Sequence, residues 1–474
     1  MAALKRHIAL VGFMGAGKTS LGVEAGRRTG LGFADVDAAV EHQAGDSIAD
    51  FFKTNGEAAF RKLEEEVTVR HLELEPDGIL ALGGGAVTSA AVKEALRAYA
   101  VTVWVDVDVD TAWERARGTG RPLAQDEGEF RRLFDERRPV YEDVADVTVT
   151  DTDGIVLAAG GIYVERGSLE RLGELVPGRG AIEIVADARV AGIYGMETQL
   201  ALGTRAIATH ELPPGEAAKT VGAIERLWRD LRLDRSGTLV ALGGGCTTDT
   251  AGFVAATYMR GIDWVAVPTT LVGQVDAAIG GKTAIDLPGA KNIVGAFHWP
   301  VRTIIDPALL ETLPEAELLN GRAEMVKTGL LAGEPLWELP LPESVRRCAA
   351  FKTAICLRDP HDRGDRRQLN LGHTFAHALE AAAGYELPHG RAVALGLLAA
   401  LRLSGLDTNV VEEILRPEPV KVDRELAWEA LMRDKKAVGG VPRLVLLDSP
   451  GVPHIDVPMP KTDVRAALDA LIAG

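Results

Sequence analysis

Short apolar runs alternate with longer amphipathic stretches along the first two thirds of the chain. In the N-terminal part such runs end near Val11, Asp37, Leu82 and Thr150, and helical periodicity follows the first three of them. Apolar runs of strand length that are each followed by a helical pattern are typical of α/β domains. The pattern therefore predicts a parallel sheet with covering helices for residues 1–154.

The alternation begins again at Ile155 and continues to Pro307 through the runs IYVERG, AIEIVAD, RAIATHE, TLVALGGG, DWVAVPTT and RTIIDP. This predicts a second α/β domain with a mostly parallel sheet over residues 155–312. Strands then become scarce, so residues 313–474 are predicted to form a mostly α-helical domain. A cleft between two such domains is a common place for a binding site. No long Gly/Ser or Pro linker separates the first domain from the second, so we expect them to lie close together.

Composition narrows the possible functions. The length of 474 residues leaves room for two or three domains, and the apolar content of 47% is ordinary for a globular protein. The formal net charge of -16 argues against nucleic acids and membranes as partners. The three cysteines, Cys246, Cys348 and Cys356, show no metal-ligand spacing, which suits a reduced compartment. No apolar run approaches the length of a membrane span, so we expect a cytoplasmic protein that acts on small molecules.

A phosphate-binding loop follows the first predicted strand. The segment GFMGAGKT has the spacing G-x-x-x-x-G-K-[ST], with a strand before it and a helix after it. In such a loop the backbone N–H groups bind phosphates, the lysine reaches the β/γ oxygens and the threonine binds Mg²⁺. The sequence therefore predicts a site for ATP with Mg²⁺, or for GTP. Its expected residues are Gly12, Gly15, Ala16, Gly17, Lys18, Thr19 and Ser20.

Candidate acceptor-binding residues lie further along the same domain. They are Asp35 and Asp37 in FADVD, Arg61 in FRKLE, Gly83, Gly84 and Gly85 in ALGGG, Arg121 in RPL and Arg137 in RRPVY. Arginine binds a carboxylate through two parallel hydrogen bonds, which lysine does less well. An acidic pair, several arginines and a glycine turn therefore suit a small polyhydroxy carboxylate.

In order and spacing these motifs resemble shikimate kinase. The resemblance implies that Asp37 holds the acceptor hydroxyl and takes its proton, and that Asp35 orients a water bound to Mg²⁺. Arg61, Arg137 and the glycines at 83–85 would bind the carboxylate and ring of shikimate. Arg121 would close with a short lid, between Ala116 and Phe130, and stabilise the transferring phosphoryl group. No residue is assigned to the adenine.

A second ALGGG begins at Ala241, again between a strand and a helical run. Its flanks share nothing else with the first copy, so we interpret the two as independent anion-binding turns. An ordered set of phosphate donors and glycines follows. The set comprises Arg260, Thr269, Thr270, Asp276, the GGK at 280–282, Lys291 and Asn292. No G-x-G-x-x-G occurs here, so the motifs alone do not predict a Rossmann dinucleotide site.

This stretch, and the chain nearly to its C-terminus, closely resembles 3-dehydroquinate synthase. The resemblance implies an NAD⁺ site formed by Asp187, Glu216, Lys219, Gly244, Gly245, Asp249, Thr269 and Thr270. It implies substrate binding by Arg260, Asp276, Lys282, Lys291, Asn292, Lys352, Arg366, Asn370 and a lysine of the DKK segment, Lys436 in preference to Lys435. The catalytic residues would be Lys282, Lys327, Asp362 and His377.

The metal ligands have two possible assignments. His373 and His377 lie four residues apart, so spacing alone makes them a ligand pair on one helix. The resemblance instead implies Glu324, His373 and His389 as ligands of Zn²⁺ or Co²⁺, with His377 as an acid/base residue. We follow the resemblance, because two neutral histidines and one carboxylate leave open positions for a chelating substrate.

Two features depart from the family pattern. Asp362 stands where the family usually has a glutamate, and one methylene fewer shifts an acceptor by about 1 Å, a displacement that can cost on the order of 10²-fold in rate. The helical stretch between Lys327 and Lys352 is also shorter than usual. Neither departure removes a metal ligand.

Together the motifs favour a bifunctional enzyme. One half would phosphorylate shikimate with ATP. The other would cyclise 3-deoxy-D-arabino-heptulosonate 7-phosphate to 3-dehydroquinate with NAD⁺ and a metal, releasing phosphate, and would pair as a homodimer. Two alternatives remain open: another sugar-phosphate cyclase fused to a small-metabolite kinase, or a first domain that only senses nucleotide.

Overall fold

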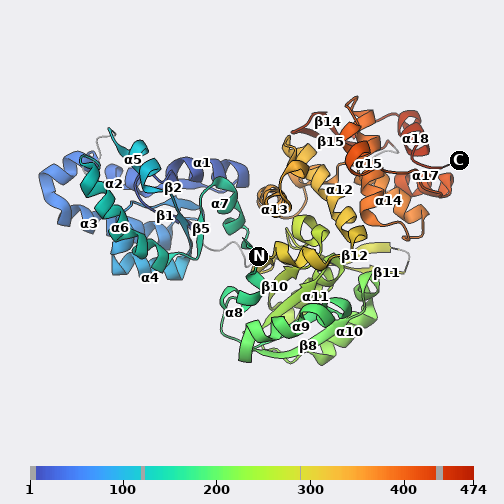
Figure 1. Cartoon of the computed structure of the whole chain (residues 1–474), viewed down its shortest axis with the longest axis horizontal. Coiled ribbons are helices and arrows are strands. Elements are labelled where there is room, and N and C mark those ends of the chain that lie inside the picture. The colour runs from blue at the N-terminus through green and yellow to red at the C-terminus, as the bar shows by residue number, and fades with distance from the viewer. Residues whose placement is uncertain (1–6, 119–122, 289, 434–440, 474) are drawn as a thin grey trace. The chain divides into compact units, whose positions relative to one another are not determined.

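A computed structural model describes residues 7–118, 123–288, 290–433 and 441–473 (Figure 1). It contains two compact units, residues 1–162 and 163–474. None of the described helices is both long and apolar enough to cross a membrane.

The first unit is built on a five-stranded sheet in the order β2-β3-β1-β4-β5, in which all neighbours are parallel. Its strands are β1 (His7–Val11), β2 (Phe33–Asp35), β3 (Ile79–Ala81), β4 (Ala100–Val105) and β5 (Val147–Val149). The central strand β1 is buried along its whole length, as its apolar sequence requires. The carboxyl ends of the strands share one edge, where the phosphate loop and the first ALGGG emerge.

Helices flank this sheet (Figure 1). They are α1 (Lys18–Thr29), α2 (Val36–Ala44), α3 (Ile48–Leu74), α4 (Ala90–Tyr99), α5 (Val109–Ala116), α6 (Glu127–Val144) and α7 (Thr152–Ala159). The long helix α3 bends at Gly56, whose φ of 81° is not helical.

The structure continues the first unit beyond Gly154. The alternation of apolar runs in the sequence begins again at Ile155, whereas Thr152–Ala159 form helix α7. Asp151 caps this helix, and residues 153–159 are buried. Asp153 accepts a hydrogen bond of 2.7 Å from Arg28 on α1. This packing places α7 in the first unit, and the division falls after Ile162.

The second unit contains a six-stranded sheet in the order β6-β13-β10-β9-β7-β8. Its strands are β6 (Ile162–Val164), β7 (Ile182–Asp187), β8 (Ala206–Leu212), β9 (Thr238–Gly243), β10 (Asp263–Pro268) and β13 (Arg302–Ile305). The pairs from β13 through to β8 are parallel, as predicted. The accompanying helices are α8 (Leu172–Leu175), α9 (Ala188–Leu202), α10 (Val221–Asp230) and α11 (Gly245–Thr257).

An antiparallel hairpin, β11 (Lys282–Leu287) and β12 (Ala290–Phe297), interrupts this pattern. From its sequence, the segment is expected only to supply phosphate donors. Pairing between Lys282 and Phe297 begins the hairpin, and it holds Lys291 and Asn292 on one ordered strand.

The remainder of the second unit is mostly helical, as predicted (orange to red in Figure 1). Its helices are α12 (Glu315–Ala332), α13 (Leu341–Arg358), α14 (His373–Ala382), α15 (His389–Leu403), α16 (Asn409–Ile414), α17 (Arg424–Arg433) and α18 (Lys461–Asp469). A hairpin of β14 (Arg443–Ser449) and β15 (Val452–Pro458) lies among them. Helices α12, α14 and α15 share one hydrophobic core, which brings their polar residues close together.

Candidate functional site

The phosphate loop joins β1 to α1. Gly12, Gly15 and Gly17 have φ values of 144°, 82° and 89°, which favour glycine. A Cβ on Gly15 would lie 2.3 Å from the carbonyl oxygen of Ala112, so a side chain does not fit there. The N-terminus of α1 has no side-chain cap, and its N–H groups are therefore available to an anion.

Lys18 folds back over this loop. Its Nζ donates to the carbonyl oxygens of Gly12 at 2.8 Å and Phe13 at 3.2 Å. Arg115, which has no role in the motifs of the sequence, donates from Nη1 to the carbonyl oxygen of Gly15 at 3.4 Å. Two cationic side chains thus meet at the loop. Ser20 is exposed on α1 beyond them, and Arg121 lies outside the described residues.

Thr19 connects the loop to the acidic pair. Its Oγ1 donates to Oδ2 of Asp35 at 2.7 Å. The other carboxylate oxygen of Asp35 accepts from the backbone N–H of Asp37 at 3.0 Å. Thr19, Asp35 and Asp37 therefore lie side by side at the end of β2.

The first ALGGG, Arg61 and Arg137 surround Asp37. A Cβ on Gly83 would lie 2.7 Å from Oδ1 of Asp37, and a Cβ on Gly85 would lie 2.1 Å from Nη1 of Arg61. Arg137 donates from Nη1 to the carbonyl oxygen of Gly84 at 3.1 Å. The structure thus brings the sequence-selected acceptor residues together, apart from the undescribed Arg121. A cavity of about 470 Å³ opens beside Arg61 and Gly85.

Glu64 and Tyr141 belong to this cluster but were not selected from the sequence. Glu64 is only 3% exposed and accepts from Nη1 of Arg61 at 2.6 Å. Burial raises the pKa of Glu64, although the guanidinium of Arg61 opposes this. The Tyr141 hydroxyl donates to the carbonyl oxygen of Gly84 at 2.6 Å, and burial raises its pKa to about 12. Their signal was present in the sequence, since both residues end motifs, FRKLE and RRPVY, that were selected for their arginines.

In the second unit, β9 leads through the second glycine run into α11. Gly244 stands at the N-terminus of α11, which has no side-chain cap. A Cβ on Gly244 would lie 2.9 Å from Cγ2 of Thr270, so the turn packs closely on that threonine. The Thr269 hydroxyl is buried and has no hydrogen-bond partner among the described residues. An uncapped helix end beside an orphaned hydroxyl suits a bound phosphate group, which fits a dinucleotide.

Charged residues line the same edge of this sheet. Lys219 donates to Oδ2 of Asp249 at 2.6 Å and also contacts Oδ1 of Asn292. Burial raises the pKa of Asp249, and Lys219 opposes this. Asp187, at the carboxyl end of the neighbouring strand β7, caps α9 by accepting from the Arg189 N–H at 2.8 Å.

A group of lysines and carboxylates lies between α12, α13 and the π-helical turn Gly273–Ala277. Lys352 is 2.8 Å from Oδ1 of Asp276, and Lys327 is 3.6 Å from the same oxygen. Lys327 also pairs with Glu324. Burial alone would raise the pKa of Asp276, but Lys327 and Lys352 hold it below the ordinary value.

Asp362 forms the second acidic contact of this region. Its φ is 55°, and its Oδ2 lies 2.6 Å from Nζ of Lys282. Its Oδ1 is buried without a hydrogen-bond partner among the described residues. Arg366 is buried close by, where a Cβ on Gly280 would lie 2.5 Å from its Nη2. The side chain of Asp362, although one methylene shorter than glutamate, therefore still reaches Lys282.

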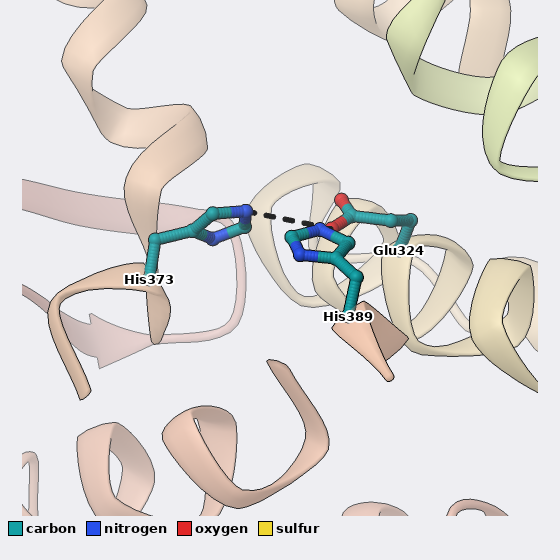
Figure 2. A group of neighbouring side chains, drawn as sticks. All are labelled: Glu324, His373 and His389. Carbon is teal, nitrogen blue, oxygen red and sulfur yellow. Dashed lines mark hydrogen bonds and ion pairs between the residues drawn. The ribbon is translucent and has the colours of Figure 1, made fainter. Parts of the chain in front are cut away.

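Glu324, His373 and His389 form a cluster of three potential metal ligands, whose ligand atoms all lie within 4.8 Å of one another (Figure 2). Nε2 of His389 is 3.2 Å from Oε1 of Glu324, and Nε2 of His373 is 3.5 Å from the same oxygen. The residues come from α12, α14 and α15, and both histidines are the first residues of their helices. Close approach at Gly390, where a Cβ would lie 2.3 Å from the Asn320 Cα, sets the start of α15 against α12.

The other nitrogen of each ring is anchored. Nδ1 of His389 is 3.0 Å from Oε1 of Glu380, and Nδ1 of His373 is 3.2 Å from the carbonyl oxygen of Leu371. Burial lowers the pKa of His389, but Glu324 and Glu380 raise it more, to about 10. Burial lowers the pKa of His373. Rings held at Nδ1 present Nε2 to a metal, so this donor set fits Zn²⁺.

Several other sequence-selected residues are not part of the three-ligand cluster. His377 is exposed one turn beyond His373, with its ring centroid 5.4 Å from that of His373. The group of three potential metal ligands thus contains His389, and not His377, which the i, i+4 spacing suggests as the partner of His373. Arg260 is exposed with a φ of 69°, and Asn370 bonds to the carbonyl oxygen of Arg367 at 3.1 Å. Lys436 lies outside the described residues. Glu380, whose carboxylate lies 3.0 Å from Nδ1 of His389, was missed although it follows His377 by only three residues.

Family models match most of the chain. The shikimate kinase model matches residues 14–168. The 3-dehydroquinate synthase N-terminal and C-terminal models match residues 209–320 and 321–437.

Individual proteins of known function are similar to the second part of the chain. The 3-dehydroquinate synthase of Latilactobacillus sakei is 38% identical over 312 residues, which is 60% of this chain and 88% of that protein. The 3-dehydroquinate synthase of Bordetella pertussis is 39% identical over 341 residues, 65% of this chain and 95% of that protein. The solved structure of 2-epi-5-epi-valiolone synthase from Streptomyces hygroscopicus, with NAD⁺ and Zn²⁺ bound, is 26% identical with a TM-score of 0.57. The match covers 65% of this chain and 96% of that one.

Proposed function

The chain belongs to the 3-dehydroquinate synthase family and carries a shikimate kinase domain ahead of its synthase part, and from this premise we propose the ligands and residue roles of its two sites. It is a bifunctional enzyme of the shikimate pathway, with a kinase and a lyase in one chain.

The kinase site binds ATP with Mg²⁺. The loop at 12–20 and Lys18 hold the phosphates, and Thr19 and Asp35, joined by their hydrogen bond, hold the magnesium ion and its water. Asp37 accepts the proton of the attacking shikimate hydroxyl. Arg61, which Glu64 orients, and Arg137 bind the carboxylate, while the glycines at 83–85 let the ring approach the backbone. Arg121 contributes from the lid.

The synthase site binds a divalent metal and NAD⁺. Glu324, His373 and His389 hold the metal, Zn²⁺ or Co²⁺, which when bound polarises the substrate hydroxyls. The second glycine turn, Thr269, Thr270, Asp249 and Lys219 hold NAD⁺, which when bound accepts and returns a hydride. Glu216 and Asp187 complete the dinucleotide site.

The chain's own side chains position the heptulosonate phosphate and move its protons. Lys352 and Lys327, already paired with Asp276, offer cationic N–H groups to the substrate. Lys282 and Asp362, whose Nζ and Oδ2 atoms lie 2.6 Å apart, exchange a proton with the heptulosonate phosphate. His377 serves as a further acid/base residue beside the metal. Arg260, Lys291, Asn292, Arg366, Asn370 and Lys436 complete the binding set.

The single observation that carries the synthase assignment is the trio of ligands with both imidazoles anchored at Nδ1. The alternative of a cyclase for another sugar phosphate remains, since the valiolone synthase has the same fold. The higher identity to dehydroquinate synthases, 38% against 26%, favours dehydroquinate as the product.

We also propose that the second unit pairs as a homodimer in the cytoplasm. Helix α9 exposes a row of apolar side chains, with Ile193, Met196 and Leu200 at 56%, 77% and 76% exposure. An exposed row of apolar side chains of this kind often marks a protein–protein interface. Light scattering of the wild type and of Met196→Glu tests this, and a monomeric wild type would exclude it.

The experiment for the two activities is a crossover on the full chain. Lys18→Met is expected to abolish shikimate-dependent ADP formation and leave phosphate release from the heptulosonate phosphate intact. Glu324→Gln is expected to do the reverse. A wild type that binds ATP but forms no ADP with shikimate would instead favour a nucleotide-sensing first domain.

A further inference from the structure

Tyr385 has an unusual backbone conformation. It lies in the loop between α14 and α15 with a φ of 65°, directly after Gly384 with a φ of 61°. A bulky residue in this region is uncommon, because its Cβ crowds the backbone, and glycine or asparagine would be the unstrained choice. Strain of this kind is often found where a side chain is needed in one place.

The ring of Tyr385 contacts the hairpin that carries substrate-binding residues. Nζ of Lys291, on β12, lies 4.9 Å from the ring centroid. The same ammonium lies 2.6 Å from Oε1 of Glu216. Lys291 thus joins a proposed dinucleotide residue to an aromatic ring from the helical part of the unit. Tyr385 as a whole is 38% exposed, so its side chain is only partly buried beside Lys291.

The backbone of Tyr385 contacts the support of the metal centre. Its N–H donates to the carbonyl oxygen of Glu380 at 2.7 Å. The Glu380 carboxylate in turn lies 3.0 Å from Nδ1 of His389. The loop that holds Tyr385 follows the end of α14 at Ala382 and leads directly into His389, the first residue of α15.

These contacts form one continuous path from Glu216 through Lys291, Tyr385 and Glu380 to His389. We propose that Tyr385 is a positioning residue that couples the β11–β12 hairpin to the metal centre, so that a bound metal orders the hairpin against the dinucleotide site. The proposal rests on the proposed metal site. It gives Tyr385 no contact with the reacting atoms.

The test is hydrogen exchange of the β12 peptide in the full chain, with and without Zn²⁺ and without NAD⁺. In the wild type, zinc is expected to slow this exchange on the order of tenfold, which is the scale of one cation–π interaction. Tyr385→Phe keeps the ring and should retain the effect. Tyr385→Leu has the same backbone strain but lacks the ring. In this variant zinc should slow the exchange of β12 by less than about twofold. Lys291→Met removes the ammonium that faces the ring, so it should show the same small effect of zinc on exchange as Tyr385→Leu. It therefore serves as a second test if Tyr385→Leu does not fold.

Zinc protection that is equal in the wild type, Tyr385→Leu and Lys291→Met overturns the proposal. A wild type that binds zinc, measured by chelator competition, but shows no protection of β12 overturns the coupling and leaves the metal site standing. A wild type that binds no zinc overturns both. Loss of protection in the leucine and methionine variants, with zinc affinity within about threefold of wild type, supports the coupling.

Discussion

Nδ1 of His389 lies 3.0 Å from Oε1 of Glu380, and this contact fixes the face that the ring turns to Glu324. Carboxylates that hold the far nitrogen of a ligand histidine orient the ring and increase its basicity. The proposed metal centre would therefore depend on a fourth residue, Glu380, that does not bind the metal itself.

Glu380→Gln is expected to lower zinc affinity about 10- to 100-fold, the usual cost of losing such a partner. Competition with a chelating dye measures this. Glu386→Gln changes an exposed glutamate of the next loop and should leave the affinity unchanged. Equal affinities for both variants would show that Glu380 does not support the site.

Zinc binding is expected to release about one proton per ion near neutral pH. With a pKa of about 10, His389 is protonated in the metal-free protein, whereas His373, whose pKa is lowered, is neutral. A ligand histidine must be neutral, so affinity should rise roughly tenfold per pH unit below that pKa. Calorimetry in buffers of different ionisation enthalpy counts the protons. Release of none would mean that His389 is already neutral.

Arg137→Lys is expected to raise the KM for shikimate about 10- to 100-fold with little change in the KM for ATP, because lysine loses the paired geometry of a guanidinium on a carboxylate. Arg132→Lys, on the same helix at an exposed position, is the matched control. A rise in the ATP KM alone would remove Arg137 from the shikimate site.

Asp362→Asn is expected to lower the kcat of the synthase on the order of 10²-fold, because Lys282 loses its acidic partner at 2.6 Å. Burial lowers the pKa of Lys282, and Asp362 opposes this, so the variant should also shift the alkaline limb of the rate profile to lower pH. Asp365→Asn is the exposed control on the same segment. Full activity of Asp362→Asn would show that the carboxylate at this position is not needed for catalysis, so its difference from glutamate would not matter either.

Sequence alone predicts the parts of this enzyme that depend on local chemistry. The phosphate loop, the acidic pair at Asp35 and Asp37 and the alternation of strands and helices all follow from spacing and periodicity. Spacing and periodicity do not identify His389, instead of His377, as the third candidate ligand. Its position depends on where the start of α15 packs against α12. Only the resemblance to the synthase family supplies this assignment.

Other features depend on packing that no local pattern reveals. Helix α7 is fixed in the first unit by the ion pair of Arg28 with Asp153. The hairpin β11–β12 forms through cross-strand pairing of a segment whose sequence indicates only phosphate donors. Glu64 lies within a selected motif, but its contact with Arg61, like that of Glu380 with His389, depends on the folded positions of both side chains.

The synthase activity is tested most directly by phosphate release from 3-deoxy-D-arabino-heptulosonate 7-phosphate. It should be measured on the full chain with NAD⁺ and Zn²⁺, comparing the wild type with His373→Ala. We expect release that requires the metal, NAD⁺ and His373, with no net NADH. A folded, zinc-loaded wild type that releases no phosphate would contradict the assignment of a dehydroquinate synthase to this chain.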